Sequence, residues 1–172
     1  EIMADPSPVV GLPEFEFIEL FNTTSTYINL DGFVLRIGST DKTISNIQIE
    51  PNGYLLLAHA DAVTALQAFG STYGFSSFQL ANSGAVVTLL NAQGDELSTV
   101  SYTDVWYGDS QKAEGGWTLE QKDPANPCGG ASNWSASSDV SGGTPGRKNS
   151  IDVPDGSLPD IASIKLLSDN VL

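Results

Sequence analysis

The sequence contains almost none of the residues from which metal and redox centres are usually built. It has one cysteine, Cys128, and one histidine, His59, among 172 residues. A single thiol excludes a disulfide within the chain and any cysteine-based zinc cluster. A single imidazole excludes a site made of several histidines. We therefore expect no metal ion and no cofactor.

Basic residues are also scarce. Lysine and arginine together number 7 against 21 acidic residues, a net charge of −14, and the only adjacent basic pair is Arg147-Lys148. Proteins that bind nucleic acid need clustered cations to neutralise phosphates, so nucleic acid is excluded as a partner. The longest clear apolar run covers residues 54–58, far short of the ~18 residues of a membrane span. We expect no membrane insertion.

The composition nevertheless supports a folded domain. Hydrophobic residues make up 40% of the chain, and 7 Phe, 5 Tyr and 3 Trp supply bulk for a core. The length suits one domain with some chain left over. No signal peptide is visible, and Glu1 begins inside a strand-like pattern. We expect a mature form or a fragment of a longer protein.

The pattern of apolar residues predicts an all-β protein. Asp61 and Gly70 bound one helical segment at residues 62–69. Residues 123–146 are rich in Gly, Pro, Ser and Asn, so we expect ordered coil there. Short apolar segments between turn residues predict strands at residues 27–30, 33–37, 43–50, 54–58, 78–80, 86–90, 97–102 and 117–120.

Residues 14–20 allow two interpretations. Polar and apolar residues alternate up to Phe17, and the alternation then continues from Ile18 in the opposite phase. A β-bulge would produce this slip and would leave Glu14, Glu16 and Glu19 facing outward. The alternative is a central strand covered on both faces.

The composition changes again after residue 149. Residues 150–160, with two prolines and three aspartates, predict an extended linker. A new apolar segment then begins, and we expect residues 161–172 to be the truncated start of a following immunoglobulin-like β domain. The alternative is that residues 161–167 add to the main sheet as an edge strand.

Several motifs between residues 1 and 149 together resemble one family, the lamin-tail domain in its bacterial form. Each motif alone is weak, but their order along the chain is specific. They are Glu16-Phe-Ile-Glu-Leu-Phe-Asn22, Ile28-Asn-Leu-Asp-Gly-Phe-Val-Leu35, Ile49-Glu-Pro-Asn-Gly-Tyr-Leu-Leu-Leu-Ala58, Leu80-Ala-Asn-Ser-Gly84 with Val86-Val-Thr-Leu-Leu90, Gly116-Trp-Thr-Leu-Glu120, Asn133-Trp-Ser-Ala-Ser137 and Gly142-Gly-Thr-Pro-Gly-Arg-Lys-Asn149.

The resemblance implies an immunoglobulin-like antiparallel β-sandwich, which the number of predicted strands supports independently. It also implies an accessory module without catalytic residues, belonging to a secreted or cell-surface multidomain bacterial protein. We expect a role in adhesion, scaffolding or positioning of neighbouring domains. The expected partners are neighbouring domains of the same polypeptide, other surface proteins or glycans. A carbohydrate-binding module is the first alternative, and a non-catalytic part of a hydrolase is the second.

Two aromatic residues are the candidates for ligand contact. Trp106 and Tyr107 follow the last strand of a predicted hairpin, in a loop that also contains Asp104 and Asp109. Exposed aromatic rings beside carboxylates would suit stacking on a sugar. The competing interpretation is that Trp106 closes the open end of the sandwich. We assign Trp117 and Trp134 to packing.

The remaining candidates favour structural roles. No activating context for a serine accompanies His59, so we expect a strand-end histidine bonded to a loop. Glu14 and Glu16 would lie ~7 Å apart on one strand face, a spacing that suits a calcium ion but is more typical of a solvated surface. Cys128 is expected to be a lone loop thiol, with a bond to another domain as the alternative.

Overall fold

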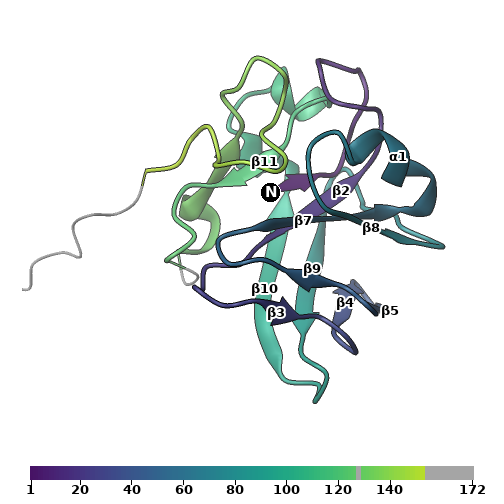
Figure 1. The fold of residues 1–172 in the computed structure, drawn as a ribbon. Helices are drawn as coiled ribbons and strands as arrows, with labels where there is room; N and C mark the ends of the chain where they lie inside the picture. Colours follow the sequence, from purple (N-terminus) through teal and green to yellow (C-terminus); the bar gives the residue numbers. More distant parts are fainter. Residues whose placement is uncertain (127–128, 154–172) are drawn as a thin grey trace, which may run out of the picture.

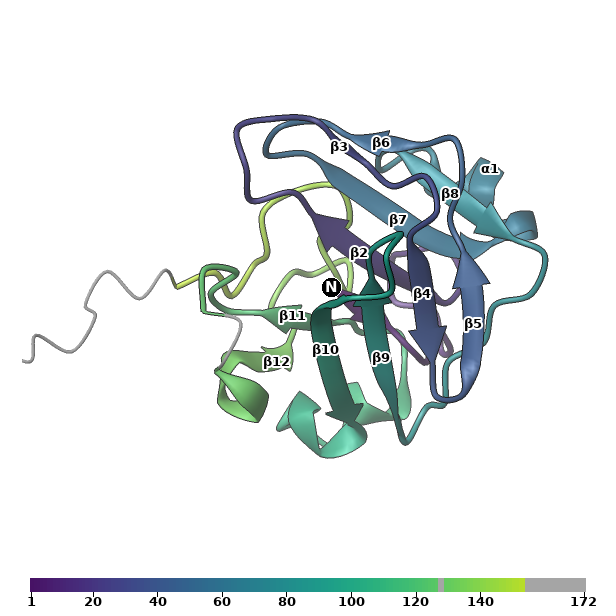
Figure 2. The same cartoon turned by 90° about the horizontal axis from the view of Figure 1, so that it is seen from below.

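The computed structural model describes residues 1–126 and 129–153 of the 172-residue chain. The predictions for Cys128, for residues 154–160 of the expected linker and for residues 161–172 lie outside the described residues. Figures 1 and 2 show two stacked β-sheets with a single short α-helix against one of them. This arrangement confirms the predicted all-β sandwich.

The larger sheet has six strands in the order β12-β11-β1-β2-β7-β8. Its neighbours run antiparallel, except that β8 is parallel to β7. Strand β1 has only two residues. The strands on either side of it, β2 and β11, continue past the point where Ile2 begins β1. The strands of this sheet are β1 (Ile2–Met3), β2 (Phe17–Phe21), β7 (Tyr54–His59), β8 (Thr72–Phe75), β11 (Leu119–Gln121) and β12 (Trp134–Ala136).

The smaller sheet has four strands in the order β10-β9-β4-β5, all antiparallel. Figure 2 shows it stacked over the larger sheet, with β10 at one edge. A further pair, β3 with β6, lies beside the two main sheets. The bounds are β3 (Ile28–Asn29), β4 (Val34–Ile37), β5 (Thr40–Thr43), β6 (Gln48–Ile49), β9 (Gly84–Leu90) and β10 (Glu96–Thr103).

Two apolar clusters cover opposite faces of the larger sheet. The main cluster includes Ile18, Leu35, Leu55 and Leu57 and lies between the sheets. The second lies under the helical segment, where Phe17, Leu56 and Leu66 are completely buried. Buried apolar area is the dominant stabilising contribution in such a fold. The central strands β2 and β7 are therefore covered on both sides.

Strand β2 decides between the two interpretations of residues 14–20. Phe17 belongs to one cluster and Ile18 to the other, and the β2–β7 register is regular from Phe17–Ala58 to Phe21–Tyr54. The strand contains no bulge, so the bulge prediction is wrong and the central-strand alternative is right. The prediction that Glu19 faces solvent is also wrong, because its side chain is only 8% exposed.

The predicted helix is shorter than expected. A 3₁₀ turn at Ala60–Ala62 leads into α1 at Val63–Leu66. The cap at its start is His59, whose Nδ1 accepts the Asp61 amide hydrogen at 3.2 Å. His59, and not Asp61, is therefore the N-cap residue, and the Asp61 backbone N–H is the group that it caps.

Three further boundaries differ from the prediction. Residues 78–80 form no strand, and β8 lies a few residues earlier. The expected strand at residues 43–50 is divided, because β5 ends at Thr43 and β6 begins at Gln48. Strand β12 lies within the predicted coil and pairs with β11. The strands predicted at residues 54–58, 86–90 and 97–102 are confirmed by β7, β9 and β10.

Candidate functional site

Three buried glutamates form the most concentrated group of charged side chains in the described fold. Glu1, Glu19 and Glu120 are 7%, 8% and 0% exposed. They come from the neighbouring strands β1, β2 and β11, with Glu1 directly before β1. All three accept hydrogen bonds from residues 144–151, the segment after the last strand. We call these three residues the glutamate clasp.

Thr144 lies at the centre of the clasp. Its amide N–H donates to Glu1 Oε1 at 3.0 Å, and its Oγ1 lies 2.9 Å from Glu1 Oε2 and 2.8 Å from Glu120 Oε1. A hydroxyl has only one hydrogen to donate. The second of these short contacts is therefore a hydrogen bond only if that carboxyl group keeps its own proton. The geometry favours a proton shared within the clasp.

Three further hydrogen bonds of the clasp extend along the same segment. Glu19 Oε2 accepts the Gly146 amide hydrogen at 2.5 Å. Glu120 Oε2 accepts from Ser150 Oγ at 2.8 Å and from the Ile151 amide at 3.2 Å. The segment is thus fixed to three adjacent strands by its backbone and its hydroxyl groups.

Burial raises the pKa of two glutamates of the clasp, Glu19 and Glu1. It raises the pKa of Glu19 from about 4.5 to about 8. The α-ammonium group of Glu1 and the Gly146 hydrogen bond oppose this rise, and the carboxyls of Glu1 and Glu120 reinforce it. Burial likewise raises the pKa of Glu1. Protons are therefore retained here at pH values where exposed carboxyl groups are ionised.

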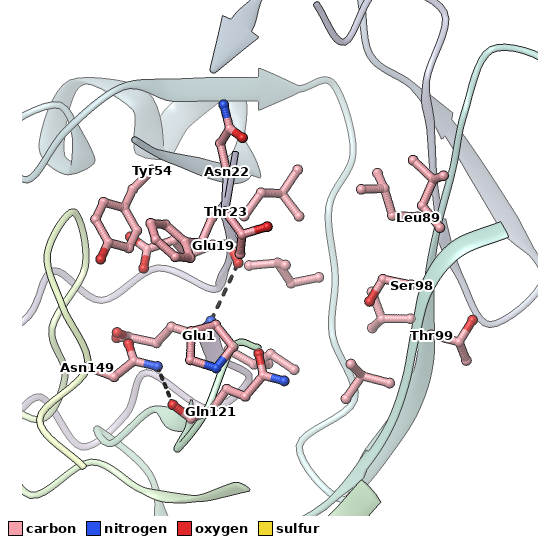
Figure 3. Close-up of a pocket in the computed structure, with 18 of the residues that line it drawn as sticks. Glu1, Glu19, Asn22, Thr23, Tyr54, Leu89, Ser98, Thr99, Gln121 and Asn149 are labelled. Carbon is pink, nitrogen blue, oxygen red and sulfur yellow. Dashed lines mark hydrogen bonds between the residues drawn. The ribbon is translucent and has the colours of Figure 1, made fainter. Parts of the chain in front are cut away.

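A cleft of about 780 Å³ lies next to the clasp and reaches between the two sheets. Figure 3 shows Glu1, Glu19 and Tyr54 on one side of it, facing Leu89, Ser98 and Thr99 on the other. Its walls are mostly apolar. They include Leu20, Phe33, Leu89, Val100, Trp106 and Trp134.

The structure separates the two aromatic candidates. Both lie on the 3₁₀ turn at Asp104–Tyr107, but Tyr107 is only 4% exposed and its hydroxyl donates to the Trp117 carbonyl at 3.1 Å. Trp106 is partly buried, lies 6.2 Å from Trp134 between ring centroids, and lines the cleft. Ligand contact by these residues stays a prediction.

The other candidates have structural partners. His59 Nε2 lies 3.2 Å from the Ser76 carbonyl, so the tautomer with hydrogen on Nε2 satisfies both ring nitrogens. Glu16 accepts the Leu80 amide hydrogen, whereas Glu14 is exposed. Within residues 1–126 and 129–153, no group of three or more His, Cys, Asp or Glu side chains is arranged to hold a metal ion.

Sequence reasoning missed the clasp and the cleft. One signal was available: Glu19 lies between Ile18 and Leu20 in a strand that is covered on both faces. A carboxyl in such a position needs buried hydrogen-bond donors. The motif at residues 142–149 supplies such donors from Thr144 and Gly146.

The stacked antiparallel sheets and single short helix define an immunoglobulin-like β-sandwich. The family model for the lamin tail domain matches residues 1–104. The chain belongs to this family, as its motifs indicated, and domains of the family are generally non-catalytic. No curated protein matches the chain. None of the helices in the described part is long and apolar enough to cross a membrane.

Proposed function

We propose that this domain is a non-catalytic interaction module of a secreted or cell-surface multidomain bacterial protein, and that it positions its neighbouring domains. The observation that carries the proposal is the glutamate clasp. It ties residues 144–151 to the centre of the larger sheet. A module that sets the orientation of its neighbours needs a firmly held connecting segment.

Further hydrogen bonds attach the connecting segment to the domain beyond those of the clasp. Asn149 Nδ2 donates to the Gln121 carbonyl at 2.8 Å, and the Val153 amide donates to the Lys122 carbonyl at 2.9 Å. Hydrogen bonds between neutral groups such as these contribute ~0.5–1.5 kcal/mol each. Several such bonds acting together fix the direction in which the chain proceeds at residue 153.

The charge distribution supports an exported setting. An excess of acidic residues keeps a protein soluble and discourages non-specific contact with anionic polymers and membranes. The partners proposed here are neighbouring domains of the same polypeptide and other surface proteins. Their contact regions would be exposed strand edges and end loops.

Loss of the Thr144 hydroxyl should loosen the connecting segment. Thr144→Val leaves the carboxyl groups of Glu1 and Glu120 facing an apolar side chain, so we expect a destabilisation of ~1–3 kcal/mol. Spin labels attached at Val153→Cys and Tyr27→Cys, both exposed positions, measure the distance between the connecting segment and the rest of the domain. Cys128 is replaced by Ser so that only these two positions are labelled. The distance distribution should be narrow in the parent and broader in Thr144→Val.

Thr40→Val is the matched control for this measurement, because Thr40 is exposed on β5. It should leave the distribution narrow. An equally narrow distribution in Thr144→Val would contradict the positioning role. A broad distribution in the parent protein would contradict it as well.

The carbohydrate-binding alternative depends on Trp106, because that ring lines the cleft. A sugar stacked on it would change tryptophan fluorescence, and Trp106→Ala should then weaken binding by about tenfold or more. Titration against a panel of polysaccharides measures both effects. Tyr27→Ala, which removes an aromatic ring 58% exposed on another part of the surface, is the control. The alternative is rejected by a wild-type protein that gives no response, or by a response that Trp106→Ala leaves unchanged.

A further inference from the structure

Strand β10 is the longest described strand and lies at an edge of its sheet. The hydrogen bonds of the neighbouring strand β9 show which backbone groups of β10 point away from the sheet. The Gly38 amide donates to the Val86 carbonyl, so Val86 and alternate residues of β9 bond to β4. The intervening residues of β9 bond to β10 through Ser98, Val100 and Tyr102. The N–H and C=O groups of Thr99, Ser101 and Thr103 therefore point away from the sheet.

This edge lacks the features that normally protect an exposed strand. Residues 97–103 contain no charged residue and no proline, and both are common protection against unwanted pairing. A register shift between Glu96 and Ser98 disturbs only one end of the strand. By contrast, the opposite edge strand β5 is four residues long and carries Asp41 and Lys42. The β10 edge is thus the best template for an added strand among the described strands.

The cleft lies along the same edge. The consecutive β10 residues from Leu97 to Ser101 all line it, together with Trp106 and Trp134. A strand added beside β10 would direct alternate side chains toward the space between the sheets. The volume of about 780 Å³ falls within the ~300–1,000 Å³ of typical ligand pockets. The cleft can therefore receive apolar side chains from such a strand.

Charge indicates what kind of segment fits. The cleft contains the acidic side chains of Glu1, Glu19 and Asp152 and one cation, Lys148, whose Nζ lies 2.6 Å from Asp152. A second copy of the chain would bring another net charge of −14, which disfavours self-association. A basic partner would be attracted to the negative charge of the domain as a whole.

We propose that the β10 edge and the adjoining cleft bind an extended, basic segment of a partner polypeptide, which adds to the four-stranded sheet as a fifth strand. Alternate apolar side chains of the segment enter the cleft, and its lysine or arginine residues are attracted by the excess of acidic residues on the domain. The backbone groups of Thr99, Ser101 and Thr103 form the new ladder. This inference rests on the proposed interaction role and names the kind of partner.

Random peptides about as long as β10, displayed and selected on the full 172-residue chain, test the proposal. We expect the selected peptides to combine alternating apolar residues with lysine or arginine. Hydrogen exchange with the best peptide bound should slow at the Thr99, Ser101 and Thr103 amides. Replacing its basic residue by glutamate should weaken binding by about tenfold or more, a change of ~1.4 kcal/mol.

Ser101→Pro is the variant directed at the edge. The proline removes the outward N–H of residue 101 and should therefore abolish peptide binding. Proline is tolerated at positions of edge strands where the N–H faces solvent. Ser101→Ala keeps the N–H and should bind normally. Should Ser101→Pro misfold, two versions of the peptide, N-methylated at one or the other set of alternate amides, provide the same test on the unaltered protein. One version should lose binding and the other should keep it.

Other occupants give distinct results, and each would overturn the proposal. Slow exchange at the edge amides before any peptide is added would mean that a second copy or another part of the chain covers β10. Binding of glycans but not peptides would assign the cleft to carbohydrate. Tight binding of both N-methylated versions would exclude strand addition. The spin-label measurement on Thr144→Val does not involve β10, so its result separates failure of this inference from failure of the positioning role.

Discussion

Gly146→Ala should remove most of the stability of the domain. Gly146 has φ of +77°, and a Cβ at this position would overlap the Phe69 carbonyl oxygen. The left-handed conformation alone costs a side-chain-bearing residue ~1–2 kcal/mol, and the contact adds to this because the obstacle is backbone. We expect the free energy of unfolding to fall by more than ~3 kcal/mol, measured by chemical denaturation and by the melting temperature.

Gly38→Ala separates the two contributions to this effect. Gly38 also has a positive φ, +59°, but a Cβ there would meet nothing within 4 Å. Its cost should be limited to the ~1–2 kcal/mol of the left-handed conformation. Equal losses in the two variants would show that the close approach of Gly146 to Phe69 does not contribute.

The position of Gly146 also connects this prediction to the clasp. Its amide donates to Glu19 Oε2, a contact between residues 127 positions apart in the sequence. A shift of residue 146 away from Phe69 would lengthen this hydrogen bond. Gly146→Ala should therefore release the connecting segment as well as lower stability, and the spin-label distances described above should broaden.

Much of the fold could be predicted because local pattern and burial agree in the central strands. The run Tyr54-Leu-Leu-Leu-Ala58 predicts a buried strand, and β7 is one. The hairpin of β9 and β10 follows from two alternating segments around a short turn. Strand β12, in contrast, has three residues set among Gly, Ser and Asn, and only its pairing with β11 makes it a strand. Such short edge segments carry little signal of their own.

The site was less predictable because it is built from long-range contacts. Alternation alone placed Glu19 on the outside, since the phase change between Phe17 and Ile18 fits a bulge as well as a doubly covered strand. The donors that satisfy Glu19 and Glu120 come from residues 144–151. Their approach depends on how the end of the chain folds back over β1, β2 and β11. No spacing rule in the sequence encodes that return.

The stability of the domain should fall as the pH rises from 5 to 9, which is opposite to the behaviour of a protein stabilised by ionised carboxylates. Burial raises the pKa of Glu19 to about 8 in the folded state, against 4.5 when the chain is unfolded. Below pH 4.5 both states hold the proton and the raised pKa costs nothing. Between pH 4.5 and 8 the unfolded state releases the proton while the folded state keeps it, so stability falls over this range, and above 8 both states are ionised and the profile levels off. Each unit of difference between the two pKa values corresponds to about 1.4 kcal/mol, so the loss amounts to several kcal/mol.

Chemical denaturation of wild type, Glu19→Gln and Glu14→Gln across this pH range tests the assignment. Glu19→Gln cannot ionise and should make the profile less steep, with Glu1 contributing the remaining slope, so that it is more stable than wild type at pH 9 and similar at pH 5. Glu14 is exposed, and Glu14→Gln should keep the wild-type slope.

Asp139, whose pKa is lowered mainly by its hydrogen bond from Arg147, loses its contribution to stability only as the pH falls through the acid range. Tyr102, whose pKa burial raises to about 12, loses its contribution only above pH 10. Neither group titrates between pH 5 and 9, so a wild-type profile that stays flat there would mean that Glu19 is ionised in the folded domain and that the clasp holds no proton.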